Sequence, residues 1–226
     1  MVKNMELGAG TLAIIFLVAA SAMAFRHLKK YADAMRKVAE SLNFTYEKSW
    51  DMSSLNNYIG FDFYKNKKDL QFIKHIMSGS RNCVDITIFE FTHRKRRISS
   101  DESNHINQTQ TVFVFKADGM DLPHFEMNPK GIFNKIGVIF GKQDITFQAH
   151  PLFSNKYVLR GDDEKLIRQV FDESVLSFFE KHTGLTVEGK NNTLIIYKRL
   201  QVIESHMIST YLDGYLNIQK IFMANE

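Results

Sequence analysis

The pattern of hydrophobic and polar positions changes along the chain, and its first part is almost uniformly apolar. The residues from Leu7 to Phe25 are uncharged. At 1.5 Å per residue, a helix of this length just spans a hydrocarbon core of about 30 Å. The segment therefore predicts a transmembrane helix near the amino terminus.

The charges that flank this segment predict its orientation. Lys3 is offset by Glu6 on one side, whereas five basic residues follow on the other: Arg26, Lys29, Lys30, Arg36 and Lys37. Such charges remain on the cytoplasmic side of a membrane, which predicts a single-pass protein of the inner membrane with its amino terminus outside and its carboxy-terminal part in the cytoplasm. A cleaved signal peptide, ending at the small residues around Ala24, and a buried core helix are the alternatives.

The helix is predicted to continue beyond the membrane. Leu28, Tyr31, Met35 and Val38 recur at spacings of three and four, with charged residues on the other face. Since neither Pro nor Gly occurs between Thr11 and Leu42, we expect one helix from about residue 8 to 42. These four residues form a candidate partner-binding stripe, although the stripe could instead pack on the chain's own domain or lie on the membrane. Arg26, Lys29 and Lys30 are candidate contacts for lipid headgroups.

After Asn43 the pattern becomes mostly strand-like. Short runs rich in β-branched and aromatic residues are separated by turn-forming clusters such as Ser78-Gly79-Ser80. The expected strands are 44–47, 70–77, 84–91, 109–115, 124–127, 145–149, 157–159, 185–187 and 193–197, with a hairpin at 189–192. Few helices separate them, which favours antiparallel pairing.

Two helices are expected within this part. The first begins with Asp162 as N-cap and runs from Asp163 to Lys181, with Leu166, Phe171 and Phe178 on its apolar face. The second runs from about Val202 to Phe222. The predicted fold class is α+β: a transmembrane helix with its juxtamembrane continuation (1–42), then a mainly antiparallel sheet domain with two packed helices (43–226).

Composition adds little to this picture. The net charge of +4 is small and much of it lies beside the apolar segment, which favours a lipid bilayer over nucleic acid as the partner. Cys83 is the single cysteine, so no disulfide framework is possible within the chain, and we expect its thiol in the core.

Several short motifs, taken in order, carry a resemblance to a family. They are Ile76-Met77-Ser78-Gly79, Asp85 to Phe91, Gln110-Thr111-Val112, Leu122 to Pro129, Gly141 to Phe147, and Tyr157 to Asp162, within a stretch from Leu70 to Tyr197. The chain resembles uncharacterised bacterial single-span proteins that are classed only as domains of unknown function. The resemblance implies a cytoplasmic domain on a membrane anchor and brings no catalytic residues.

A search for catalytic chemistry finds no signature. There is no phosphate-binding loop, no metal-ligand spacing and no nucleophile motif, so no catalytic residue, metal or cofactor is predicted. His124, Glu126 and His150 are weak candidates for a site that only the fold would assemble. Cys83 as a nucleophile and the Asp162–Asp163 pair are weaker still, since both aspartates suit helix capping.

The densest charge is the run from His93 to Arg97, which is followed by a polar stretch (98–108) that we expect to be a loop. A solvated hairpin end, lipid headgroups or an acidic partner could account for this run. Two functions follow. The first is a non-catalytic accessory or scaffold protein that binds another membrane-associated protein or itself. The alternative is a membrane-proximal enzyme whose site is invisible in the sequence.

Overall fold

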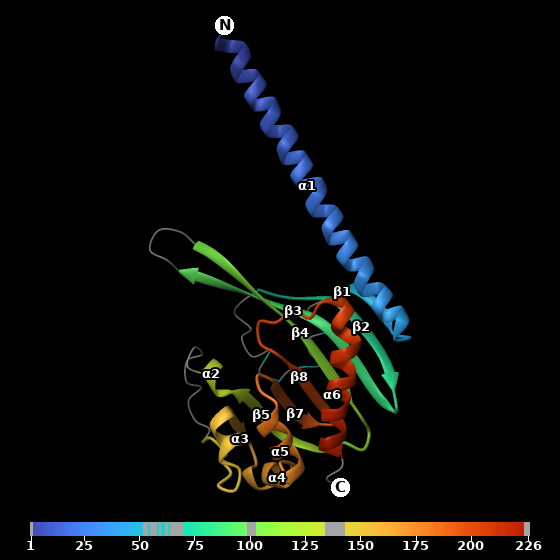
Figure 1. The fold of residues 1–226 in the computed structure, drawn as a ribbon, viewed down its shortest axis with the longest axis vertical. Coiled ribbons are helices and arrows are strands. Elements are labelled where there is room, and N and C mark those ends of the chain that lie inside the picture. Colours follow the sequence, from blue (N-terminus) through green and yellow to red (C-terminus); the bar gives the residue numbers. More distant parts are fainter. Residues whose placement is uncertain are drawn as a thin grey trace.

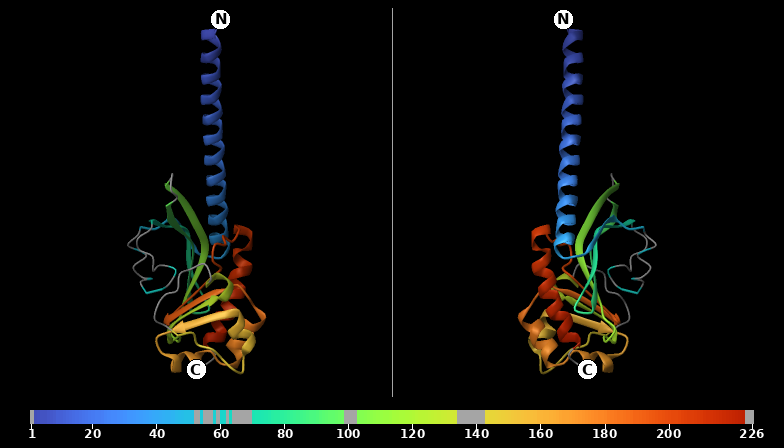
Figure 2. Two further views of the ribbon diagram at one scale, coloured as in Figure 1. Left: turned by 90° about the vertical axis from the view of Figure 1, so that its left-hand side faces the viewer. Right: turned by 90° about the vertical axis from the view of Figure 1, so that its right-hand side faces the viewer.

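The computed structural model describes residues 2–51, 54, 58, 60–61, 63, 70–98, 103–133 and 143–223. Helix α1 (Val2–Ser41) is one uninterrupted helix, as predicted, and it projects far beyond the rest of the molecule (Figure 1). Its carboxy-terminal turns lie on a domain made of one twisted sheet and several shorter helices (Figure 2). The predicted α+β class is confirmed. The division at residue 42 stays a prediction.

Among the described residues, the sheet has eight strands in the order β1-β2-β3-β4-β8-β7-β5-β6, and each of their pairings is antiparallel. The strands are β1 (Thr45–Ser49), β2 (Leu70–Arg81), β3 (Val84–Ile98), β4 (Ser103–Lys116), β5 (Leu122–Pro129), β6 (Tyr157–Gly161), β7 (Thr186–Asn191) and β8 (Thr193–Tyr197). The helices that follow α1 are α2 (Lys130–Phe133), α3 (Pro151–Lys156), α4 (Glu164–Val170), α5 (Glu173–Lys181), the short 3-10 helix η3 (Ser205–Met207) and α6 (Ile208–Met223).

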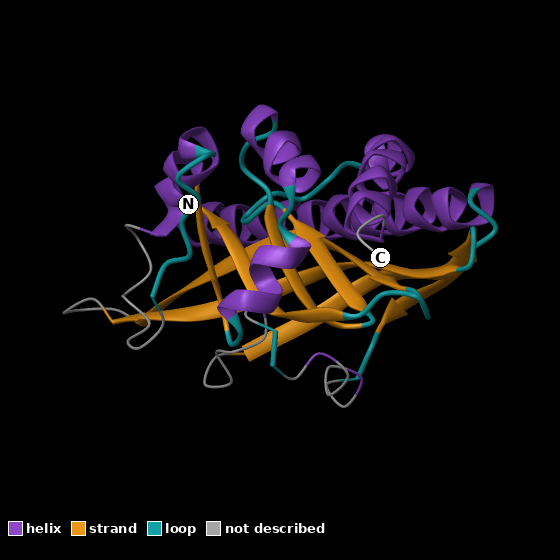
Figure 3. Ribbon diagram, turned by 90° about the horizontal axis from the view of Figure 1, so that it is seen from below, coloured by secondary structure: helices purple, strands orange, loops and turns teal. Residues whose placement is uncertain are grey.

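The two faces of the sheet are covered differently, because side chains alternate along each strand. On β3, Ile86 and Ile88 enter the larger core, where the end of α1 and helices α4, α5 and α6 pack. Phe89 and Phe91 enter a second core, which described residues of the 50–63 segment cover, among them Tyr58 and Phe63. Figure 3 shows most of the helices on one side of the sheet.

The predicted turn at Ser78-Gly79-Ser80 is wrong, because β2 runs straight through it. A Cβ atom on Gly79 would lie 2.2 Å from the ring of Phe44, so the glycine makes room for an aromatic side chain rather than for a turn. The chain turns instead at Asn82 and Cys83, both with positive φ (54° and 60°), as a two-residue hairpin requires. Cys83 is therefore exposed, and the expectation that its thiol is buried is wrong.

The polar stretch 98–108 is largely strand rather than loop. Residues 103–108 belong to β4 and pair with β3 in unbroken register, from His93 opposite Gln108 to Ile98 opposite Ser103. Residues 99–102 lie outside the described residues. Further on, the expected strand 145–149 is reduced to one isolated bridge between Ile145 and Leu159.

The helix expected from Asp163 to Lys181 is two helices. Asp163, not Asp162, caps α4 by accepting a hydrogen bond from the Leu166 amide at 3.0 Å. Asp172 then caps α5 by accepting from the amides of Ser174 and Val175. The buried residues also differ from the expected apolar face: Leu166 is 47% exposed and Phe178 only half-buried, whereas Phe171 is buried. The last helix begins at Ile208, later than expected.

Candidate functional site at the junction of α1 and the sheet

Helix α1 has two environments along one axis. From residue 12 to residue 25 its side chains are exposed, with Phe16 74% and Phe25 70% accessible, whereas Met35 and Ala39 are completely buried in the domain. Among the described residues, α1 is the one helix long and apolar enough to cross a membrane. A continuous apolar surface of this size is unfavourable in water, and a bilayer would cover it.

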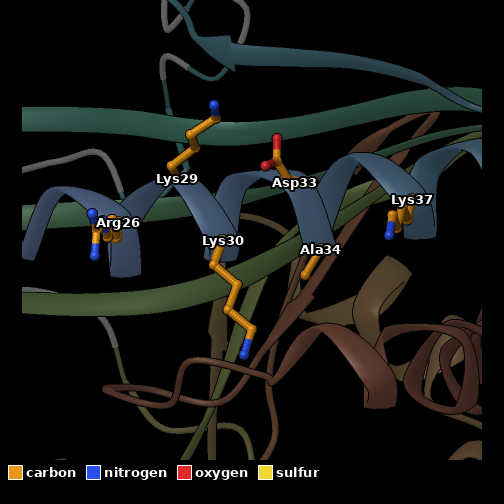
Figure 4. A pocket seen from close by; sticks show the side chains of 6 residues that line it. All are labelled: Arg26, Lys29, Lys30, Asp33, Ala34 and Lys37. Atoms are coloured by element: carbon orange, nitrogen blue, oxygen red, sulfur yellow. The ribbon is translucent and has the colours of Figure 1, made fainter. Parts of the chain in front are cut away.

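The basic residues follow where the exposed apolar surface ends. Arg26, Lys29, Lys30 and Lys37, together with Asp33, line an open depression along the outside of α1 (Figure 4). Lys29 and Lys30 extend to opposite sides of the helix in this view. Because all the lining residues come from one helix, the depression is a cationic helix surface and not a site where groups from several elements converge. Contact of Arg26, Lys29 and Lys30 with headgroups stays a prediction.

Most of the predicted partner-binding stripe packs on the chain's own domain. Met35 is buried, and Tyr31 and Val38 are partly buried against the same core. Leu28 is different, because it is 68% exposed. Packing on the domain therefore accounts for three of the four stripe residues, and binding of a partner to the stripe stays a prediction.

A polar cluster fixes α1 to the sheet at the start of this packing. The hydroxyl of Tyr31 donates a short hydrogen bond to Oε1 of Glu90 on β3. Glu90 is only 8% exposed, and burial raises the pKa of its carboxyl above the ordinary value, an effect that the Tyr31 hydrogen bond opposes. Burial, and then the neighbouring Glu90, raise the pKa of Tyr31, so the phenol stays protonated and remains a donor.

His75 completes this cluster from β2. Its Nδ1 lies 2.8 Å from the hydroxyl of Tyr46, and its ring meets that of Tyr31 edge-to-face at 5.2 Å. His75 has φ of 53° at the point where the β2–β3 register shifts, which turns the side chain toward α1. Burial, and then Lys74 and Lys48, lower the pKa of His75. The cluster is a clamp of neutral rings around one buried carboxylate, suited to holding a helix in place.

Sequence reasoning missed this clamp, although one signal was present. Glu90 alternates with Ile86 and Ile88, so it had to face the same core as they do. Its partner, Tyr31, is 59 residues earlier in the chain, and spacing cannot reveal a contact of that range.

The loop between β8 and α6 lies directly beside the clamp. Thr111, which pairs with Glu90 across β3 and β4, donates its amide hydrogen to the carbonyl of Gln201, and its hydroxyl accepts from the amide of Ile203. This loop exposes apolar side chains: Leu200 is 61%, Val202 40% and Met207 37% accessible. Leu200 also has φ of 59°, a conformation that a bulky residue adopts only at a cost.

The weak catalytic candidates are not brought together. His124 bonds Asp162 at 2.5 Å, and Glu126 stands on β5 opposite Arg160 and Glu188. His150 lies between Glu173 and Glu180 on α5, with ring nitrogens 2.8 and 3.2 Å from their carboxylates. Burial lowers the pKa of His150, but the two glutamates outweigh it and raise the pKa overall. Within the described ranges, no three His, Cys, Asp or Glu side chains form a group that could hold a metal ion.

The fold and the site thus define the class of the protein: it is an α+β domain joined to a helix with a candidate membrane span. A similar solved structure is the crystal structure of the mycobacterial trehalose monomycolate transport factor A, TtfA: it shares 12% sequence identity, covers 86% of this chain and 93% of its own, and superimposes with a TM-score of 0.59. That likeness concerns the fold alone. No family model matches the chain. No curated protein matches it either. Membership of the family of single-span proteins of unknown function therefore stays a prediction.

Proposed function

We propose that this protein is a non-catalytic accessory component of a membrane system, anchored by α1, with its domain in the cytoplasm and bound to another membrane-associated protein. The continuity of α1 carries the proposal. The same helix exposes an apolar surface at residues 12–25 and buries Met35 and Ala39 in the domain, so the domain is held close to a bilayer. The similar fold of TtfA, named as a transport factor for trehalose monomycolate, is compatible with an accessory role.

The partner is proposed to bind at the loop that carries Leu200. Leu200 does not stabilise the fold, because its side chain is exposed and its left-handed backbone conformation costs free energy. Contact with a partner gives that side chain a role. Leu28, on the membrane-side end of the stripe, offers a second exposed apolar residue for the same partner.

The test uses a substitution that should keep or raise the stability of the fold and weaken binding of the partner. Leu200→Asn places at φ 59° a residue that tolerates this conformation, so the unfolding temperature should stay equal or rise. The same change removes the apolar contact. We expect the tagged full-length protein, purified in mild detergent, to lose a partner that the unsubstituted protein retains.

Leu152→Asn is the matched control. Leu152 is also exposed (58%), but it lies on α3, at the end of the domain away from α1 (Figure 1). It should retain the partner. If both variants retain it, Leu200 is not the binding surface; if both lose it, the effect is not specific to the loop.

A further inference from the structure

The β3–β4 hairpin extends well beyond the rest of the sheet. The pairing of β2 with β3 ends at Leu70 opposite Arg94, and β8 pairs with β4 only from Val112 onward. In the described part of the chain, the hairpin beyond Arg94 is therefore a two-stranded ribbon. We name residues 92–98 and 103–109 the hairpin arm; its base, residues 92–94, still pairs with β2. An isolated two-stranded ribbon is marginally stable in water, so a contact outside the domain would stabilise the arm.

The arm starts where α1 is clamped to the sheet. Tyr31 and Glu90 are in direct contact, so both elements can be measured from one point. From Glu90 to Ile98, a strand covers about 26 Å at 3.3 Å per residue. From Tyr31 back to Arg26, a helix covers about 8 Å at 1.5 Å per residue. The arm is thus long enough to reach the level at which α1 leaves the predicted hydrocarbon core.

The direction of the arm agrees with this estimate. In Figures 1 and 2 the ends of β3 and β4 project toward the side of the domain from which the amino-terminal half of α1 rises, and they splay away from the helix. The arm and α1 leave the domain as two diverging supports on one side, while α4, α5 and the end of α6 lie at the opposite end (Figure 1).

The charge of the arm indicates what it meets. Arg94 to Arg97 are four consecutive cations, and the facing segment of β4 from Ser103 to Thr109 carries no acidic residue. Asp101 and Glu102 follow in the sequence between the strands and leave a net positive charge. Arg94 is held in place, since its Nε donates to Oδ1 of Asn107 at 3.0 Å and its guanidinium lies over the ring of Phe72.

We propose that the hairpin arm is a second membrane contact, which binds anionic lipid headgroups and, with α1, fixes the orientation of the domain under the bilayer. The inference rests on the membrane anchor of the proposed function. Two supports that diverge from one clamp define a plane, whereas a single helix leaves the domain free to swing. Cations are attracted to an anionic surface within about one Debye length, and the arm is long enough to bring its cations that close to the bilayer.

The test places a fluorophore on the arm of the full-length protein in nanodiscs. Ile106 is 44% exposed on β4, so Ile106→Cys in a Cys83→Ser background offers one labelling position. The bilayer contains a lipid with a nitroxide on its headgroup, which quenches nearby fluorophores. We expect clearly stronger quenching in phosphatidylglycerol mixed with phosphatidylcholine than in phosphatidylcholine alone, and a fall in that difference when salt is raised.

The charge variant is Lys95→Gln with Arg96→Gln and Arg97→Gln, which spares the anchored Arg94. It should remove most of the lipid-dependent quenching. Lys165→Gln with Lys181→Gln and Lys220→Gln removes the same charge from exposed positions at the other end of the domain and should leave the quenching unchanged.

Each alternative outcome has its own meaning. Quenching that does not depend on phosphatidylglycerol, or that is unchanged in the arm variant, overturns the inference. Loss of a protein partner by the arm variant in cells would not rescue it. Failure of the protein to elute with the nanodisc contradicts the anchor, and with it the proposed function, before the arm is tested.

Discussion

At the scale of single residues, two phenylalanines of the α4–α5 segment lie in different environments. Phe171 is 1% exposed at the break between the helices, and its ring meets Phe125 edge-to-face with centroids 4.9 Å apart. Phe178 is half-buried, and its ring stacks on the imidazole of His182 at 4.0 Å. One ring therefore fills the core, whereas the other covers its rim.

We predict that Phe171→Ala lowers the free energy of unfolding by about 3–5 kcal/mol, because it leaves a cavity between closely packed rings. Phe178→Ala should cost about 1 kcal/mol, since solvent can take the place of the lost ring. Chemical denaturation of the full-length protein in detergent micelles measures both. Equal losses in the two variants would contradict the difference in burial between the two rings.

At the scale of elements, the contact between α1 and β3 includes one hydrogen bond, from Tyr31 to the buried carboxylate of Glu90. Tyr31→Phe would leave Glu90 without the phenol, and Glu90→Gln would replace the charged acceptor by a neutral one. We predict a coupling of about 1.5–3 kcal/mol between the two substitutions in a double-mutant cycle, as for hydrogen bonds to charged groups.

Tyr46→Phe paired with Glu90→Gln is the control for that cycle, because the Tyr46 hydroxyl bonds His75 instead. Its coupling should be much smaller. Additive effects for the Tyr31 pair would mean that the clamp is held by packing and not by the hydrogen bond.

Local sequence features were enough to predict α1 and most of the strands, because each depends on neighbours in sequence. The run without Pro or Gly from Thr11 to Leu42 predicted the helix, a run rich in β-branched and aromatic residues predicted the first half of β3, and the hairpin signal at 189–192 predicted β8. What failed depends on contacts at long range or on single backbone angles. Gly79 resembles a turn residue until Phe44 is placed over it, and residues 98–108 resemble a loop because most of them are polar, although they pair with β3. Neither the Tyr31–Glu90 pair nor the strained Leu200 has a signature in spacing.

At the scale of the whole molecule, the orientation in the membrane decides which compartment holds the domain. A cytoplasm-specific reporter fused after Glu226 should be active, and a periplasm-specific reporter there should be silent. Replacing Arg26, Lys29 and Lys30 by Glu should weaken or invert this result, because cations beside an apolar segment favour the cytoplasmic side of a membrane. A strong periplasmic signal from the unsubstituted protein would contradict the proposed orientation.

The unbroken helix also imposes a rotational phase on the molecule. An α-helix turns by about 100° and rises by 1.5 Å with each residue. Adding one residue between Arg26 and Lys30 would therefore swing the sheet, its loop and its arm about a quarter of the way around the α1 axis, while the lipid-facing half stayed where it was. The number of helical residues between the bilayer and the clamp thus determines how the domain is rotated about the α1 axis. The length of this short stretch, and not only its charge, therefore sets which face of the domain meets a partner in the membrane.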